Sequence, residues 1–268
     1  MSPEQQVQIH TTQVGESGSP VVFLHGLFGQ GKNFSTIAKA LQPDFRSLLV
    51  DLPNHGRSSW TERVDYTEHA DLVAEHLRTG PAAEEPVHLV GHSMGGKVAM
   101  VLALQHPALV DRLVVADISP VPGGSTTEFA HLLDSLAELD LTDLSRRGEA
   151  DDRLADRIQD ARVRGFLLQN LRPDGEGFRW QANLDLLRRD LPAIGGFPEL
   201  PDAVFDGPVL WMAGERSDYV RPEHVPEMRR LFPRTTQLTI KGAGHWVHSE
   251  APETFVSALR TFLGGADR

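Results

Sequence analysis

A serine flanked by small residues is the pattern in this sequence with the clearest chemical potential. Residues 91–95 read Gly-His-Ser-Met-Gly, directly after the apolar run VHLV and directly before a helical pattern that starts at Met94. A serine at a sharp turn between strand and helix presents its Oγ at the edge of a sheet, and small flanking residues avoid clashes there. We therefore predict that Ser93 is a nucleophile and that the Met94 N–H stabilises an oxyanion.

A nucleophilic serine requires a base, and the base requires a carboxylate that orients it. His245 lies in GAGHW after the last apolar run, which places it on a loop at the same sheet edge. The expected order along the chain is serine, acid, histidine. Asp117, which ends LVVAD, and Asp218, in GERSD, both fit this order. Both stay open, with a slight preference for Asp218 because its loop immediately precedes the helix and strand that lead to His245.

A second oxyanion donor is expected in the segment HGLFG, residues 25–29. The Leu27 N–H is the first choice and the Phe28 N–H the second, whereas His25 is expected to be buried and structural. An apolar stripe farther along the chain is expected to line or back an acyl pocket. The predicted pocket residues are Phe28, Phe129, Leu132, Leu133, Leu136 and Trp246.

Short apolar runs alternate with helical patterns along most of the chain, which is typical of a mostly parallel sheet covered by helices. The predicted strands are Val21–His25, Ser47–Asp51, Val87–Gly91, Leu113–Asp117, Pro208–Ala213 and Gln237–Ile240. The predicted helices are Asn33–Leu41, Thr67–Arg78, Met94–Gln105, Pro222–Leu231 and Pro252–Phe262.

The interval from about Ser119 to Phe205 differs, because it contains helical spacing and no apolar run of the strand type. We predict that residues 119–205 form a helical cap, or lid, on a core made of residues 1–118 and 206–268. Lys97, one helical turn after Ser93, is expected to be structural or solvated.

The composition excludes several classes of protein. Thirty-seven acidic residues against 26 basic ones give a net charge of −11, which disfavours nucleic acid as a partner. The absence of cysteine excludes thiolate metal sites and a cysteine nucleophile. No signal peptide or stretch long enough to span a membrane is visible, so a cytoplasmic protein is expected. No metal and no cofactor are predicted.

Taken in order, the motifs HGLFG, DLPNHGRSS, GHSMGG, GERSD and GAGHW resemble those of the α/β-hydrolase superfamily over about residues 20–265. GQGKNFSTIAKAL, GHSMGGKVAM, ADISPV and MRRLFPR look closer still to one branch, the small bacterial short-chain esterases related to mammalian α/β-hydrolase domain-containing protein eleven. The resemblance implies an eight-stranded, mostly parallel sheet, a helical cap after the sixth strand and cofactor-free hydrolysis. In that branch the acid is often the aspartate matching Asp117, whereas Asp218 matches the usual site across the superfamily.

We therefore expect an esterase that acts on a small-molecule ester with a short acyl group, through a Ser-His-Asp triad and an acyl-enzyme. The same residues would also serve a thioesterase, an amidase, a carbon–carbon bond hydrolase or a perhydrolase. A ligand receptor of this fold that keeps the triad but turns over slowly is the alternative from another class.

Overall fold

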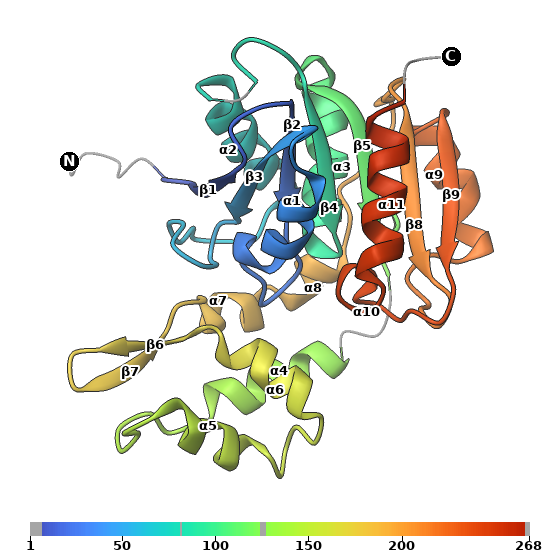
Figure 1. Ribbon diagram of the computed structural model, residues 1–268. Helices are drawn as coiled ribbons and strands as arrows, with labels where there is room; N and C mark the ends of the chain where they lie inside the picture. Colours follow the sequence, from blue (N-terminus) through green and yellow to red (C-terminus); the bar gives the residue numbers. More distant parts are fainter. Residues whose placement is uncertain (1–6, 81, 124–126, 266–268) are drawn as a thin grey trace, which may run out of the picture.

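The computed structural model describes residues 7–80, 82–123 and 127–265, in which seven strands form one sheet (Figure 1). The strands are β1 His10–Val14, β2 Ser19–Leu24, β3 Phe45–Asp51, β4 Val87–His92, β5 Val110–Ala116, β8 Val209–Gly214 and β9 Thr235–Ile240. Their order is β1-β3-β2-β4-β5-β8-β9, and only β1 runs antiparallel to its neighbour. The predicted α/β class and the six predicted strands are confirmed.

The sheet differs from the expectation at one edge. The resemblance implied eight strands, and the described residues contain seven in this sheet. β1 was not predicted, because its sequence HTTQV has one apolar residue and its side chains are exposed or half-buried. An edge strand of this kind needs no apolar run, since one side of it has no neighbouring strand. Residues 1–6 lie outside the described part of the chain.

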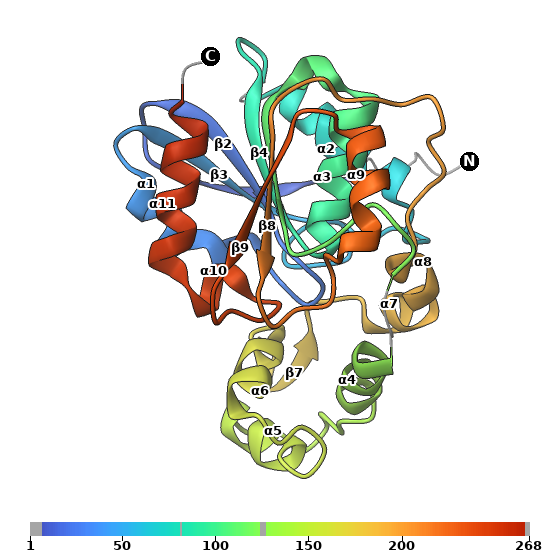
Figure 2. The ribbon, with the colours of Figure 1, turned by 90° about the vertical axis from the view of Figure 1, so that its right-hand side faces the viewer.

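Helices cover both faces of the sheet (Figure 2). α1 and α11 lie on one face, and α2, α3 and α9 lie on the other. Each face has its own buried apolar cluster, so the strands between them are buried on both sides, as β4 is along its whole length. The bounds are α1 Ser35–Leu41, α2 Tyr66–Arg78, α3 Met94–Gln105, α9 Val225–Leu231, α10 Val247–Glu250, α11 Pro252–Leu263, and the short 3₁₀ helices η1 Gly31–Phe34, η2 Pro107–Leu109 and η3 Pro222–His224.

α2 shows how the local sequence sets these elements. The Asp65 carboxylate accepts hydrogen bonds from the Thr67 and Glu68 N–H groups, which satisfies donors that the helix start leaves unpaired. Its buried residues recur every three to four positions, and this face packs against α3. No helix in the described ranges is long and apolar enough to cross a membrane.

A long insertion separates β5 from β8, and we call residues 127–195 the insertion. It lies beyond the end of the sheet at which β4 and β5 finish (Figure 1). Its elements are α4 Thr127–Ala137, α5 Arg147–Leu154, α6 Ala161–Leu168, β6 Leu171–Asp174, β7 Gly177–Trp180, α7 Leu184–Arg189 and α8 Leu191–Gly195.

The insertion contains helices, as expected, but also a pair of strands that was not predicted, because β6 and β7 pair as an antiparallel hairpin. Asp174 pairs with Gly177, so the turn contains only Gly175 and Glu176. Gly175 has a φ of 59°, a conformation that glycine adopts without the steric cost of a side chain. A glycine at the first of two turn positions is a hairpin signal that the apolar-run analysis did not use.

Two buried side chains of the core fasten the end of the insertion. Lys97 Nζ donates hydrogen bonds to the carbonyls of Ile194, Gly195 and Gly196, at 3.2, 2.8 and 2.7 Å. The Tyr66 hydroxyl also donates to the Ile194 carbonyl, at 2.7 Å. Lys97 is therefore structural rather than solvated, and burial lowers the pKa of its ammonium group to about 8.

Candidate active site

Ser93 occupies a strained turn between β4 and α3. Its φ is 52° and its ψ is −121°, values that residues with side chains rarely adopt. Glycines permit this turn: a Cβ on Gly91 would lie 2.4 Å from the Gly95 oxygen, and one on Gly95 would lie 2.4 Å from the His25 oxygen. The flanking glycines are thus required for the close approach of strand and helix, as the sequence predicted.

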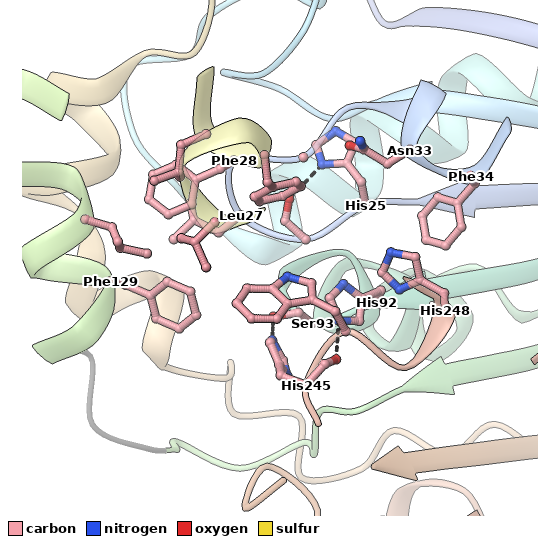
Figure 3. A pocket seen from close by; sticks show the side chains of 17 residues that line it. His25, Leu27, Phe28, Asn33, Phe34, His92, Ser93, Phe129, His245 and His248 are labelled. Atoms are coloured by element: carbon pink, nitrogen blue, oxygen red, sulfur yellow. Dashed lines mark hydrogen bonds between the residues drawn. The ribbon is translucent and has the colours of Figure 1, made fainter. Parts of the chain in front are cut away.

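His245 connects Ser93 to Asp117 (Figure 3 shows the contact with Ser93). Its Nε2 lies 3.0 Å from Ser93 Oγ, and its Nδ1 lies 2.8 Å from Asp117 Oδ2. The tautomer that suits these partners donates Nδ1–H to the carboxylate and accepts the serine proton at Nε2. The Tyr219 ring packs on the imidazole, with centroids 4.2 Å apart. The arrangement can remove a proton from Ser93 and stabilise the resulting imidazolium.

Asp117 is held from several sides. It is fully buried and has a φ of 52°. Its Oδ1 accepts a hydrogen bond from the Gly214 N–H at 2.9 Å, and its Oδ2 accepts from the Ser217 hydroxyl as well as from His245. A buried carboxylate with three donors is fixed in orientation, and it fixes the imidazole in turn.

The slight preference for Asp218 does not match this geometry. The Asp218 side chain is exposed, and its neighbour Ser217 is the residue that reaches the carboxylate of Asp117. The sheet order gives the reason, because β5 lies directly beside β4 and the Ser93 N–H bonds the Ala116 carbonyl at 3.0 Å. The residue after β5 is therefore next to the nucleophile, whereas β8 is one strand farther away.

Two unpaired backbone donors flank Ser93. In the ranges that the structure describes, neither the Leu27 nor the Met94 N–H donates a hydrogen bond, and Met94 is the first residue of α3. The loop before α1 approaches closely, because a Cβ on Gly26 would lie 3.1 Å from Ser93 Cβ. Free N–H groups at a helix start attract negative charge, so this position suits an oxyanion.

Two cavities meet at Ser93, and both are lined by Leu27 and Phe129. The first has about 510 Å³ of empty space, part of which is open to solvent. In Figure 3, Phe129 lies on one side of Ser93, and Phe34 and His248 lie on the other. The rest of its lining is His25, Gly26, Phe28, Gly29, Asn33, His92, Leu132, Val163, Phe166, Leu167, His245 and Trp246.

The second cavity has about 420 Å³ of empty space, part of which is open to solvent, and α8 forms part of its wall. Its further lining residues are Met94, Lys97, Ile118, Gly123, Leu191, Ile194, Gly195 and Tyr219. Of the predicted pocket residues, Phe28, Phe129, Leu132 and Trp246 line the first cavity. Leu133 and Leu136 line neither cavity and are fully buried in the larger core.

The sequence analysis missed the contribution of α6 to the first cavity. The apolar spacing of Val163, Phe166 and Leu167 was visible, but nothing in it shows that this helix faces Ser93. It also missed His248, because α10 is a single short turn. His25 is buried and structural, as predicted: its Nδ1–H donates to the Gly26 carbonyl, and its Nε2 accepts from the Leu52 N–H.

Burial lowers the pKa of several histidines near the site, to about 4 for His25 and His248 and to about 3 for His55. These rings are neutral in the folded protein and take up protons on unfolding below pH 6.5. We therefore expect the free energy of unfolding to have its full value above about pH 6.5 and to fall as the pH drops toward 4. The expected loss is on the order of 1–2 kcal/mol per histidine between pH 7 and 5.

Guanidinium unfolding at pH 8, 6 and 5 measures this loss. Equal free energies of unfolding at pH 8 and pH 5 would contradict it.

The fold, together with the hydrogen-bonded serine, imidazole and carboxylate, is that of a serine hydrolase. Comparison with known proteins identifies the family. A model of the alpha/beta hydrolase fold family matches residues 19–252. The chain belongs to this family.

Relatives and solved structures agree with this assignment. The sn-1-specific diacylglycerol lipase ABHD11 of Mus musculus is 42% identical over 253 residues, covering 91% of this chain and 80% of that protein. The esterase YbfF of Escherichia coli is 30% identical over 257 residues, covering 96% and 98%. The structure of a marine microorganism esterase superposes with a TM-score of 0.91 at 32% identity, covering 96% and 99%. Within the family, the chain is assigned to the serine ester hydrolases.

Proposed function

We propose that this protein hydrolyses carboxylic esters with short acyl groups, through a triad of Ser93, His245 and Asp117. The observation that carries the proposal is the continuous hydrogen-bond line from Asp117 through His245 to Ser93 Oγ. Nucleophile, base and orienting carboxylate then have the roles that acyl transfer requires.

In the proposed reaction, Ser93 Oγ attacks the ester carbonyl carbon while His245 Nε2 takes the hydroxyl proton. The carbonyl oxygen becomes an oxyanion and accepts hydrogen bonds from the Leu27 and Met94 N–H groups. The carbon–oxygen bond to the alcohol then breaks, and the imidazolium returns its proton to the departing alkoxide. A water molecule attacks the acyl-serine by the same route and releases the acid.

The two cavities would receive the two parts of the ester, because both begin at Ser93. The insertion supplies Phe129, Leu132 and Phe166 to the first cavity and Leu191 and Ile194 to the second. These contributions support the proposal that residues 119–205 act as a cap over the site. A cytoplasmic location stays a prediction.

Acyl-chain preference tests the proposed substrate class. Each buried methylene contributes about 0.8 kcal/mol, so kcat/KM for p-nitrophenyl esters should rise about fourfold per carbon over the first few carbons. It should fall once the chain exceeds the cavity. Phe129→Ala should move the optimum to longer chains, because Phe129 lines both cavities, whereas Leu133→Val, in the core behind it, should leave the optimum in place.

A steady rise to long acyl chains would contradict a short-chain esterase. It would favour acylglycerols as substrates, which is the second candidate because of the mouse diacylglycerol lipase that is 42% identical. Thioester, amide and peracid substrates in the same assay would distinguish the other reactions that this triad supports.

A further inference from the structure

The loop that carries the Leu27 N–H contains a residue in an unfavourable conformation. The Gly29 N–H bonds the Gly26 carbonyl at 2.9 Å, so residues 26–29 form a tight turn with Phe28 in its third position. Phe28 has a φ of 63°, where glycine is normally found. This conformation is sterically unfavourable for a residue with a side chain, so surrounding contacts must hold it.

Hydrogen bonds fix Phe28 on both sides, and one side belongs to the insertion. The Phe28 N–H donates to His55 Nε2 at 3.3 Å, in the core. The Phe28 carbonyl accepts from Asn170 Nδ2 at 2.8 Å, between α6 and β6, and from Gln169 Nε2 at 3.3 Å. Burial keeps the His55 ring neutral and able to accept, because it lowers the pKa to about 3.

Asn170 is built as a fixed clamp. Its side chain is fully buried, and all its polar atoms are used. Besides the bond to Phe28, Nδ2 donates to the Leu167 carbonyl at 3.2 Å, and Oδ1 accepts from Gln30 Nε2 at 3.0 Å. The amide therefore has one orientation, and it contacts the Phe28 carbonyl on one side of Gly29 and the Gln30 side chain on the other.

We propose that Asn170 is a positioning residue for the oxyanion hole: it holds the Phe28 carbonyl, and with it the turn of residues 26–29, so that the Leu27 N–H in this turn points at the developing oxyanion. This inference rests on the proposed function of Leu27. By this proposal the insertion contributes to stabilisation of the transition state, in addition to forming part of the pocket wall. When Asn170 is replaced, the Phe28 carbonyl loses the shorter of its two hydrogen bonds from the insertion. Phe28 can then leave its positive φ, and the turn can relax.

The test compares Asn170→Asp and Asn170→Ala with Tyr66→Phe. The aspartate variant has the same shape and keeps the acceptor for Gln30, but it has no donor for the Phe28 carbonyl. Tyr66→Phe removes a buried 2.7 Å bond between core and insertion at the other end, far along the chain from the loop. This variant controls for a weaker attachment of the insertion to the core that leaves the loop of residues 26–29 untouched.

We expect both Asn170 variants to lose about 10- to 100-fold in kcat with little change in KM, because a misplaced oxyanion donor weakens only transition-state binding. Affinity for a trifluoromethyl ketone, which forms an oxyanion on Ser93, should fall by the same factor as kcat/KM. Tyr66→Phe should keep kcat. Should the alanine variant not fold, Gln169→Met, which removes the weaker donor to the same carbonyl, should show a smaller loss in the same direction.

The proposal would be overturned by folded Asn170 variants with unchanged kcat, by a change in KM alone, or by an equal loss of kcat in Tyr66→Phe. A fall in kcat without a fall in ketone affinity would also contradict it. If Ser93→Ala is inactive while the Asn170 variants are fully active, this inference fails and the proposed function stands.

Discussion

Replacing Ser93 by alanine is expected to lower kcat for ester hydrolysis by about 10⁶-fold while the protein stays folded. The loss follows from the geometry, since His245 Nε2 has Ser93 Oγ as its partner at 3.0 Å, and within the described residues no other hydroxyl hydrogen-bonds this nitrogen. Multiple-turnover assays with a p-nitrophenyl ester measure the effect, and a fluorophosphonate probe should label the wild-type protein at Ser93 only.

Ser249→Ala is the matched control, because Ser249 is exposed and lines neither cavity. It should keep both turnover and labelling. Near-normal activity of a folded Ser93→Ala protein would remove the nucleophile assignment. Labelling of Ser93 without multiple turnovers would favour the ligand receptor instead.

Asp117→Asn is expected to lower kcat by about 10⁴-fold, because an amide donor opposite Nδ1 favours the imidazole tautomer that cannot accept the serine proton. Asp218→Asn should change kcat by less than about threefold, since its exposed carboxylate makes no contact with His245 in the described structure and such surface changes are normally near neutral. Steady-state kinetics of both variants, with circular dichroism to confirm folding, separates the two aspartates.

A large loss in Asp218→Asn, with Asp117→Asn nearly active, would reverse the assignment of the acid. Modest losses in both single variants and collapse in the double variant would show that the two carboxylates substitute for each other. A fully active double variant would remove both from the triad.

The sequence predicted the fold where the hydrophobic pattern is strong. The central strands are buried on both faces, so their apolar runs stand out, and the six predicted strands are all present. It did not predict β1, whose residues are mostly polar, or the β6–β7 hairpin, whose signal is turn chemistry at Gly175 rather than an apolar run. The pattern detects burial, and these elements are only partly buried.

For the candidate site, the local motifs around Ser93 and His245 contain the information that places them. The partner of His245 depends on which strands are neighbours, and that is a property of the sheet order rather than of either loop. Leu133 and Leu136 share a stripe with Leu132, but a stripe does not say which of its residues face the cavity. Asn170 could not be found from sequence, because its partner lies 142 positions away.

The attachment of α8 to the core has a consequence for how such enzymes diversify. Lys97 and Tyr66 bind only main-chain carbonyls of residues 194–196, and every amino acid carries such a carbonyl. The cavity-lining side chains of this segment can therefore be exchanged while the attachment is retained, provided that the backbone path is kept. Recombination of this segment between family members offers a route to new substrate ranges on an unchanged catalytic core.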